Sequence, residues 1–158
     1  MAEQVKEGWQ QTSPGAPGNK SFETGNFNSW QTKGNTSIQT AAYGATPTDG
    51  TYDALITNGV GAVSDTALET FAGLTAGSLD GLGNGNATEG SVLTQTISVP
   101  AGAKLSFDWN FLTNEGTPSS YNDFAFFSVG SGTSNTLANT NNSFVTSPTI
   151  FNEETGFG

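Results

Sequence analysis

The chain has 158 residues, of which 14 are acidic and only four are lysine, so its formal net charge is -10. It contains no arginine, and this balance argues against nucleic acid as a partner because phosphate recognition needs clustered cationic side chains. The absence of histidine and cysteine excludes the common zinc sites, Ser/His/Asp and Cys/His catalysis and any disulfide. Oxygen atoms are the ligands that remain for a metal ion.

The first predicted segment, residues 1–20, is an extended N-terminal tail. It contains Pro14 and Pro17 and glycines at 8, 15 and 18, a composition typical of loops rather than of folded elements. Residues 21–158 are expected to form one β-sandwich domain. We expect no membrane insertion by this chain, because no window approaches the roughly 20 apolar residues of a membrane span.

Short strands broken by Gly and Asn follow the tail, with strands predicted in "NTSIQTAAY" (35–43) and "GTYDALITNG" (50–59). One segment differs, because Leu68, Phe71 and Leu74 recur at helical spacing. Ser64 or Asp65 is a suitable N-cap, and Gly73 or Gly77 stands near the end. The pattern predicts one short helix over about residues 65–76.

The clearest strand signal is "AKLSFDWNFL", residues 103–112, where Leu105, Phe107, Trp109 and Phe111 alternate with polar residues. This phase predicts that Trp109 lies in the core rather than serving as a binding platform. The later run "FAFFSV" is apolar on both faces, as expected for a strand between two layers. The whole pattern favours an all-β fold: an antiparallel β-sandwich of jelly-roll type with one short helix.

A polar loop joins these two aromatic runs and gathers two carboxylates and two amides. If the flanking strands are neighbours, Glu115 and Asp123 approach each other, while Asn114 and Asn122 supply amide oxygens. This donor set suits calcium, which takes six to eight oxygen ligands. The same residue types also close ordinary turns, so the loop fits a cation site, turn chemistry or ligand contact.

Several segments resemble an exported β-sandwich family of cyanobacteria and other environmental bacteria, whose members often carry a PEP-CTERM sorting tail. The resemblance covers about residues 19–158 and is carried by the following segments: "NKSFETGNFNSW", "GTYDALITNG", "SDTALETFAGLTAGSLDGL", "EGSVLTQTISVPAGAKLSFDWNFLTNE" and "YNDFAFFSV". It implies an extracellular or cell-surface location and a lectin-like sandwich. Carbohydrate-binding jelly rolls with a similar "FE" segment often use its glutamate to hold a structural calcium, which implies such a role for Glu23. The alternative is that Glu23 is a solvent-exposed strand residue.

Sugar binding would use exposed aromatic rings with amides nearby, and Tyr121 and Trp30 are the candidate platforms, although Trp30 also suits the core. A glycosidase would need two carboxylates about 5 to 10 Å apart. Glu115 with Asp123, or with Asp108, fits that requirement only by residue type, so we expect no enzyme. We expect a non-catalytic surface or matrix module that acts in adhesion or assembly with the help of calcium; the alternative is a carbohydrate-binding module.

The expected partners are neighbouring copies of the chain or a surface polysaccharide. Related sequences continue beyond the position of Gly158, so one interpretation is that the domain lacks its last strands and leaves an open edge beside "SFETGNF" or its neighbour. The alternatives are a truncated chain, or a last strand assembled from "TIFNEETGFG" itself. The tail of a neighbouring copy could pair with that edge, and such strand exchange would build a polymer.

Overall fold

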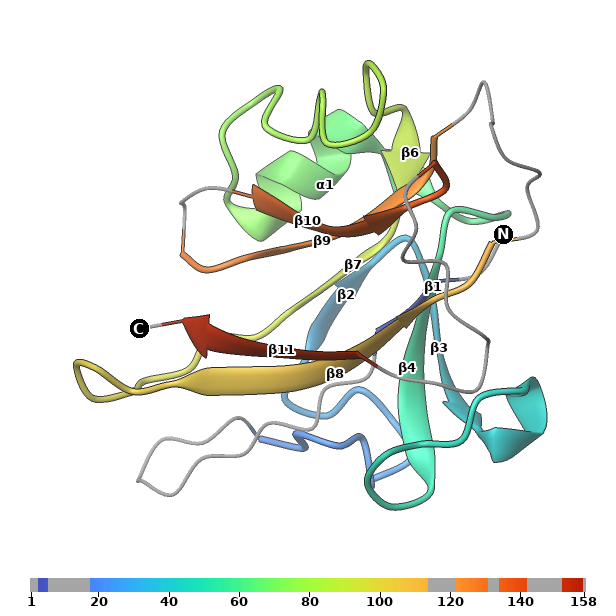
Figure 1. Ribbon diagram of the computed structural model, residues 1–158, viewed down its shortest axis with the longest axis vertical. Helices are drawn as coiled ribbons and strands as arrows, with labels where there is room; N and C mark the ends of the chain where they lie inside the picture. The colour runs from blue at the N-terminus through green and yellow to red at the C-terminus, as the bar shows by residue number, and fades with distance from the viewer. Residues whose placement is uncertain (1–2, 6–17, 114–121, 131–133, 142–151, 158) are drawn as a thin grey trace.

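The computed structural model describes residues 3–5, 18–113, 122–130, 134–141 and 152–157 (Figure 1). These residues form mostly strands, one short α-helix and one short 3-10 helix, η1 (Ala41–Tyr43). The strand pairs are antiparallel. The predicted all-β class with one short helix is therefore confirmed, and the jelly-roll topology stays a prediction. No helix in this part of the chain is long and apolar enough to cross a membrane.

The largest sheet has five strands in the order β11-β8-β1-β4-β3. The strands are β1 (Glu3–Val5), β3 (Asn35–Thr40), β4 (Tyr52–Thr57), β8 (Leu105–Phe111) and β11 (Asn152–Phe157). Residues 3–5, which belong to the tail expected from the sequence, thus form a strand between β4 and β8. Gln4 is the register partner of Leu55 on one side and of Asn110 on the other.

Three smaller sheets have two strands each. They pair β2 (Gln31–Lys33) with β7 (Val92–Thr94), β5 (Val63–Ser64) with β6 (Glu89–Gly90), and β9 (Phe124–Ser128) with β10 (Ser134–Asn139). In Figure 1 the β9–β10 hairpin lies above β8 and β11, and the helix lies beyond the hairpin.

Strand β9 packs on both of its faces, as its sequence predicts. Ala125 and Phe127 belong to a cluster with the buried residues of β8, and the Phe107 and Phe127 rings are 5.7 Å apart. Phe124 and Phe126 instead pack with residues of the helix and β7. The prediction that Trp109 lies in the core is also confirmed, since it is 4% exposed.

Helix α1 (Asp65–Ala72) is shorter than predicted, and its two ends have clear causes. The Ser64 Oγ accepts a hydrogen bond from the Ala67 backbone N–H, which caps the first turn. Gly73 adopts a left-handed conformation, and the Leu74 N–H then bonds back to the Glu69 carbonyl. The helix therefore ends at the first of the two candidate glycines, before the predicted residue 76.

Candidate functional site

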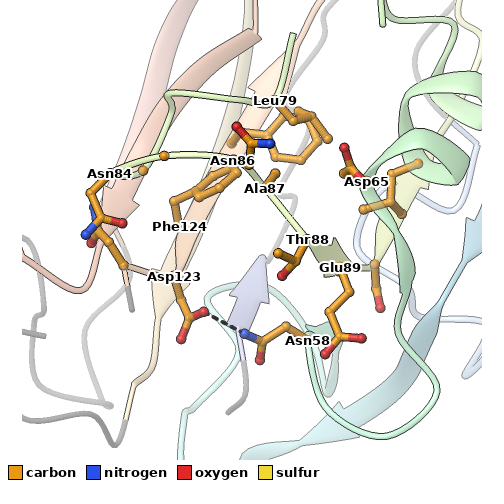
Figure 2. Close-up of a pocket in the computed structure, with 17 residues that line it drawn as sticks. Asn58, Asp65, Leu79, Asn84, Asn86, Ala87, Thr88, Glu89, Asp123 and Phe124 are labelled. Carbon is orange, nitrogen blue, oxygen red and sulfur yellow. Dashed lines mark hydrogen bonds between the residues drawn. The ribbon is translucent and has the colours of Figure 1, made fainter. Parts of the chain in front are cut away.

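The best candidate site is a cavity of about 240 Å³ between the segment that follows α1 and the start of β9 (Figure 2). One wall comes from the loop before β6 and from β6 itself, and the other comes from Asn122, Asp123 and Phe124. Asn58, from the connection between β4 and β5, and Asp65, at the start of α1, complete the polar lining. The cavity thus joins segments that are far apart in the sequence.

A buried carboxylate holds the loop that forms the first wall. Glu69 of α1 is 3% exposed, and its two oxygens accept hydrogen bonds from the backbone N–H groups of Gly77 and Leu79, at 2.9 and 3.0 Å. Further along, Asp80 Oδ1 accepts from the Ala87 N–H at 3.0 Å. Both carboxylates replace the backbone partners that an irregular segment lacks. The hydrophobic pattern did not point to either residue, because each acts through backbone groups several positions away.

The second wall contains two residues predicted from the polar loop, Asn122 and Asp123. Asp123 Oδ1 accepts a hydrogen bond from Asn58 Nδ2 at 2.9 Å, drawn as a dashed line in Figure 2. The Asn122 Oδ1 accepts from the Asn141 N–H at 3.1 Å. Both side chains therefore tie separate segments together while lining the cavity. Three other predicted site residues lie outside the described residues: Asn114, Glu115 and Tyr121.

Glu23, the remaining predicted metal ligand, holds a turn. Its Oε1 accepts from the N–H groups of Thr51 and Tyr52, at 2.8 and 2.9 Å. It is exposed and is not among the described residues that line the cavity. Its second oxygen is the atom that a cation would have to use, because backbone N–H groups already point at the first. Calcium binding at Glu23 stays a prediction.

The described part of the chain contains no group of three or more acidic side chains that could hold a metal ion. Asn58, Asn122 and Asp123 all line the cavity, and their side chains carry amide and carboxylate oxygens, the atom types that calcium prefers. Asn58 presents its Nδ2 to Asp123, however, and the Asn122 Oδ1 accepts from the Asn141 N–H. Residues 114 and 115, the predicted partners of this set, are not among the described residues. The calcium site thus stays a prediction, and two of its predicted ligands, Asn122 and Asp123, line the cavity.

Trp30 packs beside Phe22, with ring centroids 5.4 Å apart, and is 9% exposed. Its indole N–H donates to the Asn19 carbonyl at 3.1 Å. This places Trp30 in a small cluster with Phe22 and Ala54, which suits a core role. A stacking role for Trp30 stays a prediction.

The charge around the cavity has one sign. Its described lining contains three carboxylates and no lysine; the carboxylates belong to Asp65, Glu89 and Asp123. Amide groups of Asn58, Asn84, Asn86 and Asn122 accompany them, and Phe124 contributes an apolar surface. Such a lining can accept hydrogen bonds from hydroxyl or ammonium groups, and it disfavours anions because like charges repel.

Comparison of the chain with protein families, with curated proteins and with solved structures found no match.

Proposed function

We propose that the protein is a non-catalytic binding module that acts in adhesion at a cell surface or in an extracellular matrix. The cavity beside β9 would bind a hydroxyl-rich ligand, with a neutral glycan as the best candidate. The observation that carries this proposal is the lining: three carboxylates and four amides meet around one cavity beside the Phe124 ring. The extracellular location and the jelly-roll topology belong to the same proposal and rest on the sequence resemblance.

The chemistry of the lining favours hydroxyl groups over other ligands. Carboxylate oxygens accept hydrogen bonds, whereas an amide can both accept and donate, so together they match the mixed character of sugar hydroxyls. A ring such as that of Phe124 can cover the apolar face of a pyranose. The pocket is also concave and small, with a volume of about 240 Å³, which suits one or two sugar units rather than a protein surface.

The loop before β6, which forms the first wall of the cavity, is stabilised by hydrogen bonds in the absence of a ligand. The backbone N–H groups of Gly77 and Leu79 donate to the buried Glu69 carboxylate, and the Ala87 N–H donates to the exposed Asp80, and these hydrogen bonds limit the freedom of the loop. A preformed loop loses less conformational entropy on binding, so weak contacts with hydroxyl groups yield more net affinity. This is the physical reason to assign recognition to this cavity.

The proposal is tested with an array of neutral and acidic oligosaccharides, in calcium and in chelator. We expect binding to a subset of neutral glycans, with acidic glycans at least about tenfold weaker because the described lining carries only negative charge. Incubation should leave the bound glycan intact. Release of reducing ends would contradict the non-catalytic assignment.

The site is located with the double variant Asn86→Ala/Glu89→Ala. Both side chains are exposed and line the cavity, so the fold should persist while binding falls by about tenfold or more. Asn28→Ala is the matched control, because Asn28 is exposed and is not among the described lining residues. Equal glycan binding by the double variant and the control would place recognition elsewhere.

A further inference from the structure

Strand β1 occupies the middle of the five-stranded sheet although it has only three residues. It pairs antiparallel with β4 and with β8, so it covers one backbone edge of each neighbour. Both neighbours are largely buried: residues 53–57 of β4 and most of β8 belong to the interior. The position between β4 and β8 is here called the β1 slot. If β1 left it, the backbone groups of β4 and β8 that face the slot would lose their hydrogen-bond partners, and water would replace these partners poorly because both strands are largely buried.

The segment that fits the β1 slot is known, because residues 3–5 occupy it in this structure. The register fixes Glu3 opposite Ile56 and Phe111, and Val5 opposite Ala54 and Trp109. Recognition in this slot rests on main-chain pairing, which a second copy of the same segment supplies equally well. The sequence predicts strand exchange at an outer edge beside residues 21–27, whereas the structure points to an acceptor inside the sheet.

We propose that residues 3–5 of one copy can fill the β1 slot of another copy, so that copies of the chain join by strand exchange. A reciprocal exchange closes a dimer, and a one-way exchange leaves a free strand and a free slot that extend into a chain of copies. This inference goes beyond the ligand cavity and does not depend on it.

The length of the connection between β1 and residue 18 determines the protein concentration at which exchange between copies competes with the monomer, in which β1 fills its own slot. It comprises residues 6–17, which can span at most about 40 Å when extended. A short connection of this kind gives an effective concentration of about 1 mM for the segment of the same copy. Dilute protein should therefore be monomeric, and exchange should appear where copies are crowded to similar concentrations, as in a surface layer or matrix.

The first test compares refolding of the full chain at micromolar and at millimolar concentration, followed by size-exclusion chromatography with light scattering. We expect monomer from the dilute sample, and dimer with larger species from the concentrated one. The variant Gln4→Pro removes a backbone N–H from the centre of β1 and should reduce the oligomers at least fivefold. Gln4→Ala is the matched control, because it keeps the N–H and should behave as the unchanged chain.

The second test uses disulfide trapping, which is simple here because the chain has no cysteine. Gln4 and Leu55 are register partners, so the double variant Gln4→Cys/Leu55→Cys should form an intrachain disulfide when dilute. The two single-cysteine variants, given different tags and refolded together at millimolar concentration, should form a mixed disulfide dimer.

Each outcome decides the proposal. Mixed dimers that appear only at high concentration support strand exchange. An intrachain disulfide without mixed dimers means that β1 fills only its own slot, and this result would overturn the proposal. So would a double variant that forms no intrachain disulfide, or oligomers that Gln4→Pro and Gln4→Ala form equally. Glycan binding is measured separately, so a failed exchange leaves the proposed ligand cavity untouched.

Discussion

Glu69 shows how one buried carboxylate can hold the loop beside a cavity that it does not itself line. We predict that Glu69→Gln lowers the free energy of unfolding by about 1.5 to 3 kcal/mol, because a glutamine amide has one acceptor for two N–H donors. The two donors are the Gly77 and Leu79 N–H groups. Urea denaturation measures the effect. Glu89→Gln removes the same charge from an exposed position and should change the free energy of unfolding by less than about 0.5 kcal/mol. Equal losses in the two variants would contradict the role of Glu69 in stabilising the loop.

Gly50 is a second position where the surrounding structure favours one residue type, in this case glycine. It has a φ of 67°, and a Cβ at this position would overlap the Glu23 carboxyl group. We predict that Gly50→Ala costs about 2 kcal/mol, through backbone strain together with displacement of Glu23 from the Thr51 and Tyr52 N–H groups.

The control for this prediction is Gly73→Ala. Gly73 has a φ of 70°, and no neighbouring atom lies within 4 Å of the position that an alanine methyl group would take. This variant should therefore show only the backbone cost of about 1 kcal/mol. Combining Gly50→Ala with Glu23→Ala should give a smaller loss than the sum of the two single changes. Strict additivity in thermal or urea unfolding would show that Glu23 and the turn are independent.

At the scale of the element, β8 supplies the large buried side chains of one hydrophobic cluster, namely Phe107, Trp109 and Phe111. Trp109 packs in a cluster with residues of β9 and β10, so Trp109→Ala should lower the free energy of unfolding by about 3 to 5 kcal/mol. Trp109→Phe keeps most of the apolar contact and should cost less. The exposed Val60, which is 99% accessible, provides the control Val60→Ala, with an expected change below about 0.5 kcal/mol. A stable Trp109→Ala protein that had lost a ligand would instead make Trp109 a binding residue.

The elements differ in how far the sequence could predict them. The alternation in β8 and the two apolar faces of β9 are local patterns, so both strands and the burial of Trp109 could be predicted directly. The length of α1 was overestimated, because the choice between Gly73 and Gly77 depends on which glycine ends the helix in the left-handed conformation. Strand β1 has too few residues for any periodicity, and its place comes from the partners on either side.

The candidate site was predicted only in part for a related reason. Asn122 and Asp123 stood out as polar residues beside a buried strand, and they do line the cavity. Asn58, Asp65 and Glu89 line the cavity because of contacts between segments far apart in the sequence. Such contacts produce no recognisable pattern in the neighbouring residues of the sequence. Hydrogen bonds such as that between Asn58 and Asp123 join positions 65 residues apart, so their pairing could be found only from the folded chain.

For the whole molecule, the net charge of -10 causes repulsion between acidic side chains in the folded state, so bound cations should stabilise the fold. We predict that millimolar calcium raises the melting temperature and that chelator lowers it, because binding to the folded state alone adds about 2.7 kcal/mol at a hundredfold excess over Kd. Sodium chloride at matched ionic strength separates specific binding from general screening. Asp123→Asn should reduce the calcium effect if the ion binds near the cavity. Identical melting curves in calcium and in matched sodium chloride would end the calcium hypothesis.

The central position of β1 also has a consequence for the order of folding. Glu3 pairs with Ile56 and with Phe111, so one three-residue strand joins parts of the chain that are separated by more than fifty residues on either contact. Contacts of such large sequence separation form slowly, because much chain entropy is lost before they stabilise anything. The β3–β4 pair and the β9–β10 hairpin are local and can form first. The five-stranded sheet is then completed late, when β1 joins β4 to β8, and until that moment a nascent chain exposes the edges that aggregation uses.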